Sequence, residues 1–155
     1  MKILIVYYSR SGITKNVANI LKEKLDADIE EITDNNKYSG AIGWLKGGFN
    51  ASTGRLSEIN PISKNPLHYD LTIIGSPVWA SNIATPVATF INKNYKDLTK
   101  VAGFVTCGSG GGEKALEKMS EECEKQLEAT MILTSKDIEN DLDKKINTFI
   151  DKLKL

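Results

Sequence analysis

Short apolar runs and amphipathic helix patterns alternate along this chain, and that alternation limits its possible folds more than any other feature. The first run, 2–8, is almost wholly apolar after Lys2, which is typical of a strand buried on both faces. From Ile13 onward, apolar residues recur at helical intervals, which predicts an amphipathic helix. The same reasoning predicts four more strands, over 28–32, 69–75, 101–107 and 130–134, and further helices over 86–94, 113–127 and 140–153.

This order predicts an α/β fold with three layers, in which helices cover both faces of a five-stranded parallel sheet and right-handed crossovers join the strands. The chain has 155 residues and no linker or internal repeat, so we expect a single domain over 1–155. One segment departs from the pattern. Residues 37–60 stand where the second crossover helix belongs and are rich in glycine, which predicts an irregular crossover; its aromatic residues could instead form a lid or a partner surface.

The composition excludes several classes of protein. The 20 Lys and Arg residues balance the 20 Asp and Glu residues, so the chain lacks the basic excess that general nucleic-acid binding needs. Two cysteines and one histidine are too few for a disulfide scaffold or a Cys/His metal cluster, and we expect no metal. No run reaches the ~18 apolar residues that a membrane helix needs, so we expect no membrane insertion and a cytoplasmic location.

The carboxyl ends of parallel strands are where open sheets of this kind bind ligands. Three loops leave such ends, and the first is 9–14, Ser-Arg-Ser-Gly-Ile-Thr. It combines up to three hydroxyls with a glycine and leads into a helix N-terminus, which suits a phosphate group. The alternative is a tight turn in which Ser11 or Thr14 caps the helix.

The other two loops suit a flat ligand. Loop 76–82 contains Trp79, whose ring could stack on a planar group or could simply cap the core. Loop 107–113 contains four glycines within the five residues 108–112, so backbone N–H groups could approach a ring closely; the alternative is a flexible loop before a helix. Cys107 reads as a small apolar residue at a strand end or as a contact to the ligand.

Missing motifs remove other ligands and mechanisms. The chain has no G-x-G-x-x-G dinucleotide fingerprint and no G-x-x-x-x-G-K-[ST] loop. The first loop has no cysteine that could act as a phosphatase nucleophile, and no acidic residue precedes Lys22, which excludes a receiver-domain phosphoacceptor pocket.

Taken together, the loops resemble those of the flavodoxin-like family. The loop S-x-S-G-x-T after the first strand is similar to the flavodoxin phosphate loop, and GSPVWASNIATPVATFIN is similar to the family's G-[ST]-P-x-W segment. The stretch TCGSGGGE stands where the third flavin loop of that family stands. The resemblance covers nearly the whole chain and implies the strand order 2-1-3-4-5 with FMN as the cofactor.

The resemblance also implies the site residues and no catalytic residue. The FMN phosphate would be held by Ser9, Arg10, Ser11, Gly12, Ile13 and Thr14. The isoalloxazine ring would be bordered by Pro77, Val78, Trp79, Ala80 and Asn82 on one side and by Cys107, Gly108, Ser109, Gly110, Gly111 and Gly112 on the other.

Two functions follow from the resemblance, and a third stays open. The first is electron transfer between FMN and a redox partner protein. The second is an NAD(P)H-dependent quinone-type reductase, in which a small planar acceptor stacks on an open flavin face; the ending Gly111-Gly112-Glu113 resembles that of the flavodoxin-like quinone reductases. The third is a binding protein that has kept the anion loop and lost the flavin.

Overall fold

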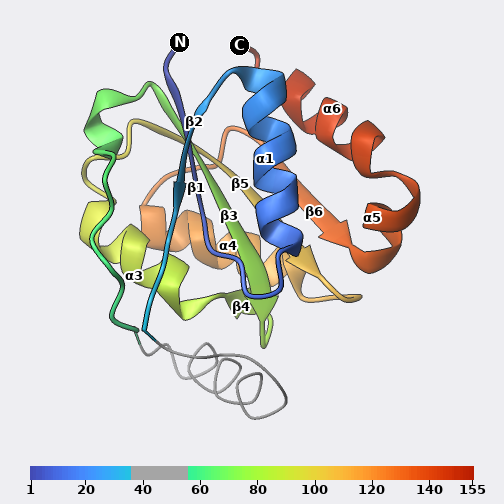
Figure 1. Cartoon of the computed structure of the whole chain (residues 1–155), viewed down its shortest axis with the longest axis horizontal. Coiled ribbons are helices and arrows are strands. Elements are labelled where there is room, and N and C mark those ends of the chain that lie inside the picture. The colour runs from blue at the N-terminus through green and yellow to red at the C-terminus, as the bar shows by residue number, and fades with distance from the viewer. Residues whose placement is uncertain (36–55) are drawn as a thin grey trace.

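A computed structural model describes residues 1–35 and 56–155 of the chain (Figure 1). Most of the glycine-rich segment 37–60 therefore lies outside the described residues, and the prediction of an irregular crossover there stays a prediction. In the described ranges, no helix combines the length and the apolar character needed to cross a membrane.

The sheet is the centre of the fold, and its strand order is β2-β1-β3-β5-β6. These five strands are parallel to their neighbours. A sixth, short strand, β4, pairs with β3 in the antiparallel direction. The strands are β1 (Ile3–Tyr7), β2 (Asp28–Glu31), β3 (Leu71–Trp79), β4 (Asn82–Ile83), β5 (Lys100–Cys107) and β6 (Thr130–Thr134). This is the predicted α/β architecture, and the order of the parallel strands is the 2-1-3-4-5 order that the resemblance implies.

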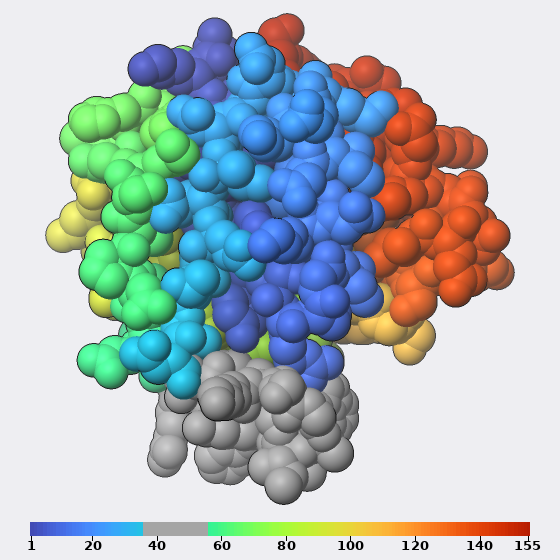
Figure 2. Space-filling view, in the orientation of Figure 1, coloured from blue at the N-terminus to red at the C-terminus, as the bar shows by residue number. Residues whose placement is uncertain are grey.

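Helices cover both faces of this sheet (Figure 1). On one face, α1 and α6 lie side by side (Figure 2), and the ammonium of Lys24 is 2.8 Å from the carboxylate of Asp143. On the other face lie α3 and α4. The helices are α1 (Ile13–Leu25), α3 (Thr85–Asn94), α4 (Gly112–Cys123), α5 (Ser135–Asn140) and α6 (Leu142–Lys152), with a 3₁₀ turn, η1, at Pro66–His68.

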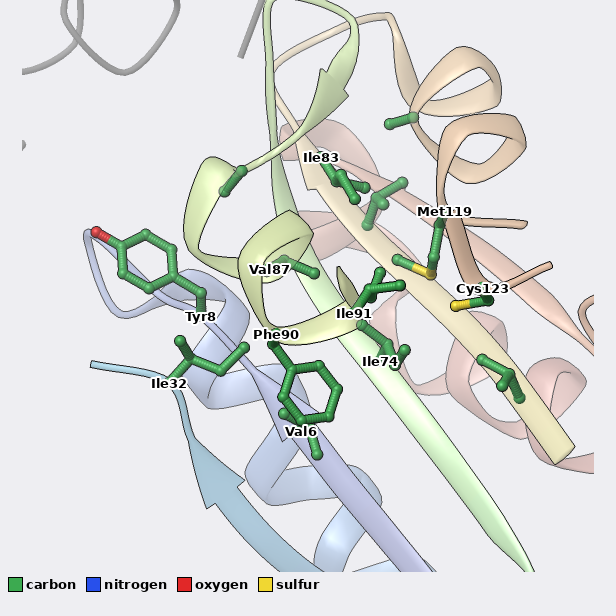
Figure 3. Packing of buried hydrophobic residues seen from close by; sticks show 14 of the residues in the cluster. Val6, Tyr8, Ile32, Ile74, Ile83, Val87, Phe90, Ile91, Met119 and Cys123 are labelled. Carbon is green, nitrogen blue, oxygen red and sulfur yellow. The ribbon is translucent and has the colours of Figure 1, made fainter. Parts of the chain in front are cut away.

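Because the sheet is covered on both faces, it separates two apolar cores. One lies under α1 and α6 and includes the fully buried side chains of Leu21, Phe104 and Phe149. The other lies under α3 and α4, where Phe90 and Met119 are fully buried (Figure 3). Alternate residues of each central strand feed the two cores, which is why β1 reads as a continuous apolar run.

The largest differences from the predicted bounds concern three elements. β3 continues to Trp79, through residues that we predicted as a loop. α4 ends at Cys123 instead of reaching residue 127, because Glu124 adopts a left-handed conformation with φ of 52°. The helix predicted over 140–153 is α6, which begins at Leu142 after Asp141, where φ is −132° and ψ is 14°, and a separate helix that was not predicted, α5, precedes it.

Candidate functional site

A pocket of about 240 Å³ lies where the carboxyl ends of β1, β3 and β5 meet, at the lower end of the sheet in Figure 1. Between β1 and β3 the strand order reverses, which is the position at which open α/β sheets bind ligands. Residues from all three predicted loops contribute to this one pocket. Its lining consists of Arg10, Ser11, Ile13, Thr14, Pro77, Val78, Trp79, Thr106, Cys107, Gly108, Ser135 and Ile138.

The first loop forms the side of the pocket next to α1. Gly12 is the N-cap residue of α1, with φ of 95°, a conformation that glycine adopts without steric cost. No side chain caps this helix, so the alternative in which Ser11 or Thr14 caps it is not what the structure contains. The Gly12 N–H donates to the Ser9 hydroxyl oxygen at 3.1 Å, which leaves the Ser9 hydroxyl hydrogen available to another acceptor.

Thr14 connects this loop to β5. Its hydroxyl oxygen lies 2.8 Å from that of Thr106, and both side chains are buried. Either hydroxyl can donate in this contact, so the other keeps its hydrogen for a further partner. Arg10 and Ile13 are exposed at the same pocket, and the large apolar side chain of Ile13 is 47% accessible.

The second region is a hairpin. β3 runs to Trp79, two residues turn the chain, and β4 begins at Asn82. Ala80 and Ser81 have φ values of 50° and 60°, and two successive left-handed residues are the mark of a type I′ turn. Such turns are common at Asn-Gly and Gly-Gly, so this pair carries backbone strain that glycine would not.

Trp79 lies on the pocket wall, but most of its surface belongs to the core. Only 5% of its surface is accessible. Its ring meets that of Tyr8 edge to face, with the centroids 5.5 Å apart and the planes at 87°. The core cap therefore describes most of this side chain, and stacking on a planar ligand stays a prediction.

The third region begins at the end of β5 with Cys107. Burial raises the pKa of its thiol, and the nearby carboxylates of Glu113 and Asp137 raise it further. The thiol is therefore protonated near neutral pH, and a protonated thiol is a poor nucleophile.

The glycines of this loop divide into two groups. A side-chain carbon added at Gly108 or Gly110 would meet no atom of the described residues within 4 Å. Gly111, with φ of 86°, faces the turn instead, because an added carbon there would lie 3.0 Å from the Cα of Ser81. An added carbon at Gly112 would lie 2.7 Å from Ile132. The first pair leaves space for a ligand, and the second pair permits close packing of α4.

The pocket brings together nine of the residues predicted for FMN. These are Arg10, Ser11, Ile13, Thr14, Pro77, Val78, Trp79, Cys107 and Gly108. The other eight predicted residues belong to the same three segments but do not line the pocket: Ser9, Gly12, Ala80, Asn82, Ser109, Gly110, Gly111 and Gly112. Asn82 accepts the N–H of Ile83 through its side-chain oxygen at 2.8 Å, a contact within the hairpin.

Three residues that line the pocket were not predicted from the sequence: Thr106, Ser135 and Ile138. The last two belong to α5, which we did not predict. Its signal was present in the sequence as Thr134-Ser135-Lys136-Asp137, a capping box. The Thr134 hydroxyl accepts the Asp137 N–H at 3.2 Å, and the Thr134 N–H donates to the Asp137 carboxylate at 2.9 Å.

Residues 1–35 and 56–155 contain no group of three or more His, Cys, Asp or Glu side chains positioned to hold a metal ion.

Comparisons with known proteins agree with this geometry. The model of the family described as Flavodoxin matches residues 2–149. The search of curated proteins found no match. Among solved structures, the chain is similar to a flavoprotein from Lactobacillus acidophilus NCFM crystallised in complex with FMN, with 26% identity over 93% of this chain and 97% of that one and a TM-score of 0.72.

Two further structures share the fold. One is a flavoprotein from Bacteroides eggerthii, with 22% identity, coverage of 99% of this chain and 98% of that one, and a TM-score of 0.75. The other is oxidised Flavodoxin 1 from Bacillus cereus, with 17% identity, coverage of 99% and 98%, and a TM-score of 0.57. Flavodoxins bind FMN between β1 and β3, where the pocket of this chain lies. From its sequence match and its fold, this chain belongs to the flavodoxin family.

Proposed function

We propose that this protein binds FMN in the pocket between β1, β3 and β5 and transfers electrons between FMN and a redox partner. The observation that carries the proposal is the convergence of hydroxyl, apolar and backbone groups from three separate loops on that pocket. FMN would supply the redox chemistry, and the protein would bind, orient and tune it.

The first loop supports a phosphate at the α1 side of the pocket. The N-terminus of α1 has no side-chain cap, so its N–H groups and the positive end of its dipole are available to an anion. Ser9, Ser11 and Thr14 would add hydroxyl donors. The Arg10 guanidinium, which lines the same pocket, would add positive charge at the rim.

The walls beyond that loop support a flat, partly apolar group. Pro77, Val78 and Trp79 line one side, and Cys107 with Gly108 lines the other. The described pocket is smaller than the roughly 300–1,000 Å³ of typical ligand sites. We therefore infer that it holds the phosphate end of FMN and that the ring lies across its mouth.

The lining chemistry favours a carrier. Hydroxyls, apolar surfaces and a guanidinium bind and orient a flavin, and the Cys107 thiol, whose pKa is raised, keeps its proton near neutral pH. Electron transfer needs no further protein group, since the cofactor accepts and releases the electrons.

A second candidate is the quinone-type reductase, and one observation favours it. The space around Gly108 and Gly110 is open among the described residues, so a planar acceptor could approach the flavin from that side. In that case the acceptor is a small molecule instead of a protein.

Reconstitution tests the binding site. Protein freed of flavin should bind FMN far more tightly than riboflavin, which lacks the phosphate, as followed by quenching of flavin fluorescence. Ser11→Asp should weaken FMN binding strongly through like-charge repulsion, whereas Ser11→Asn, of the same size without the charge, should weaken it much less. Equal affinities for FMN and riboflavin would mean that the first loop is not the phosphate site.

Redox titration then separates the two candidates. A carrier should be reduced in two resolved one-electron steps under anaerobic conditions. A single two-electron reduction, together with quinone turnover from NADH or NADPH faster than that of free FMN, would establish the reductase instead.

A further inference from the structure

β6 is the last strand of the sheet, and its outer side has no partner among the described residues. The Gly103 N–H donates to the Ala129 carbonyl at 3.0 Å, so residue 129 directs its backbone groups toward β5. Along a strand, the backbone N–H and C=O groups of successive residues point to alternate sides. Those of Met131 and Leu133 therefore also point toward β5. Thr130 and Ile132 therefore direct their N–H and C=O groups outward.

At the opposite edge of the sheet, the outermost strand, β2, contacts another segment of the chain. Two residues of the segment 56–69, Ser63 and Tyr69, donate hydrogen bonds to side chains of β2. Ser63 donates to the carboxylate of Glu30 through its N–H at 2.9 Å and its hydroxyl at 2.7 Å. The hydroxyl of Tyr69 donates to Asp28 at 2.7 Å. Natural sheets cover or blunt their edges, so the edge at β6, where no such contact to Thr130 or Ile132 is found among the described residues, is a candidate interaction surface.

The outer side of β6 lies in a groove. A cavity of about 470 Å³ lies between β6 and α6, and another of about 370 Å³ lies between β6 and α4. Thr130 and Ile132 line both cavities. The two open backbone residues thus lie between the two cavities, with α6 lining one of them and α4 the other.

The two walls carry opposite charge. On the α6 side, Lys144, Lys145 and Lys152 line the cavity, with Asp141 as the carboxylate among them. Lys145 lies 3.5 Å from Asp137, while Lys144 and Lys152 form no ion pair with a described residue.

On the α4 side the lining includes Glu113 and Glu117 beside the apolar Leu116 and Leu127. A strand added to β6 would direct alternate side chains to these two walls. The side chains toward α6 would meet ammonium groups, and the side chains toward α4 would meet apolar surface flanked by carboxylates.

This charge pattern opposes pairing between two copies of the chain. Two β6 edges can join symmetrically only as antiparallel strands about a two-fold axis perpendicular to the sheet. That axis keeps each face on its own side, so Lys144 and Lys152 of one copy would lie beside the same lysines of the other, and Glu113 and Glu117 beside the same glutamates. Like charges placed opposite each other across strands are destabilising.

We propose that the open edge of β6 is a docking site for an extended segment of a different protein, which adds a strand to the sheet. Acidic side chains of that segment face Lys144 and Lys152 on α6, and the apolar or basic side chains between them face Leu116 and Glu117 on α4. Backbone hydrogen bonds to Thr130 and Ile132 supply the affinity, and the alternating charges supply the specificity. The docked segment lies beside the flavin pocket, because Ser135 and Ile138 of that pocket follow directly after β6.

The test uses the full chain and a fluorescein-labelled peptide in which glutamate alternates with valine. Binding is measured by fluorescence anisotropy, and amide hydrogen exchange is measured at Thr130 and Ile132. The comparison peptide alternates lysine with valine. We expect the glutamate peptide to bind, exchange at both amides to slow, and the lysine peptide to bind roughly tenfold or more weakly. Removal of flavin should leave these results unchanged, so the test does not depend on the proposed function.

Three variants sharpen the test. The double variant Lys144→Glu and Lys152→Glu should reverse the preference, so that the lysine peptide binds more tightly than the glutamate peptide. The control is Lys93→Glu on the exposed side of α3, which should leave both affinities unchanged. Thr130→Pro should abolish binding of either peptide, because it removes an outward N–H at the first residue of the strand and no bond to β5.

Each other outcome overturns the proposal. Binding of both peptides with equal affinity, or a preference that survives the double charge reversal, would show that the α6 lysines do not select the partner. Binding without slowed exchange at Thr130 and Ile132 would place the peptide elsewhere. Self-association of the chain through β6, detected by sedimentation and removed by Thr130→Pro, would assign the edge to a second copy. Should Thr130→Pro fail to fold, the charge-reversal and exchange results decide alone.

Discussion

The hydroxyl oxygens of Thr14 and Thr106 lie 2.8 Å apart in a buried contact that joins the first turn of α1 to the end of β5. These residues are 92 positions apart in the chain, so the contact ties the phosphate loop to the strand that supports the opposite side of the pocket. A hydroxyl pair at this position can hold the loop in place and still direct one hydrogen to a ligand.

Thr14→Val should therefore lower the free energy of unfolding by about 1–3 kcal/mol, because it leaves the Thr106 hydroxyl buried without its partner. Valine has nearly the shape of threonine, so the loss reflects the hydrogen bond more than packing. Equilibrium unfolding in urea, without flavin, measures it. The double variant Thr14→Val and Thr106→Val should lose less than the sum of the two single variants.

Thr72 supplies the matched control for this pair. It is fully buried on β3, and its hydroxyl has no hydrogen-bond partner among the described residues. Thr72→Val should leave stability unchanged or raise it, since the substitution removes an unsatisfied polar atom. An equal loss in Thr14→Val and Thr72→Val would mean that the hydroxyl pair does not stabilise the loop.

Trp79 offers a second prediction, because its ring is 5% accessible and packs against Tyr8. Trp79→Ala should lower the free energy of unfolding by about 3–5 kcal/mol, the usual cost of removing a large buried ring. Trp79→Phe is the control, which keeps an aromatic ring against Tyr8 and should lose much less. Chemical denaturation of flavin-free protein gives both values. If the alanine variant is as stable as the wild type, the ring does not support the core.

Much of the fold could be predicted because single periodicities dominate its elements. The first helix begins at Ile13 as predicted, and the strand over 130–134 has the predicted bounds. In both, one apolar spacing persists to the end, and nothing in the flanking residues competes with it. The order of strands and helices then determines the layer architecture, so the predicted α/β fold is confirmed.

The extension of β3 could not be predicted, because Pro77 reads as a turn residue. A proline usually interrupts a central strand, since it has no N–H to donate. Here Gly75 directs its carbonyl toward β1, where it accepts the Tyr8 N–H at 3.2 Å. The backbone groups of residue 77 point to the same side as those of Gly75. Because β1 ends at Tyr7, no β1 residue stands opposite position 77, and the missing N–H of Pro77 breaks no hydrogen bond of the ladder.

The candidate site was predictable in its loops and not in its full lining. Loops at the carboxyl ends of parallel strands converge whatever their sequence, which is why Ser11, Val78 and Cys107 line one pocket. Ile138 joins them because α5, which begins directly after β6, places this side chain at the same pocket as the end of β5. That placement depends on the tertiary packing of a short helix, although the capping box at Thr134 marks where the helix begins.

The hairpin turn yields a third prediction. Ala80 has φ of 50°, a conformation that costs an L-residue with a Cβ about 1–2 kcal/mol and costs glycine little. Ala80→Gly should therefore leave stability unchanged or raise it by up to about 1 kcal/mol. The same substitution in the regular helix α3, Ala88→Gly, should lower stability by about 1 kcal/mol. Thermal unfolding of the two variants side by side gives the signs, and a loss at both positions would mean that the left-handed turn is not under strain.

The start of α5 yields the last prediction, on pH dependence. Hydrogen bonds from the Thr134 N–H and hydroxyl lower the pKa of Asp137, and Lys145 lowers it further. A carboxyl whose pKa is lower in the folded state than in the unfolded state stabilises the fold above its unfolded pKa, which is about 3.9. That contribution disappears as the pH falls through the lower, folded value.

Asp137→Asn should therefore lower the free energy of unfolding at pH 7 and have a smaller effect below the unfolded pKa of about 3.9, where the unfolded chain takes up the proton. Urea unfolding of both proteins across this pH range measures the difference. Asp151→Asn on α6 is the control, since Asp151 is exposed and takes no part in the capping box, and its effect on stability at pH 7 should be small. A difference for Asp137→Asn that stays constant from pH 7 to pH 3 would show that the ionised carboxylate does not stabilise the start of α5, and that the amide of asparagine serves there equally well.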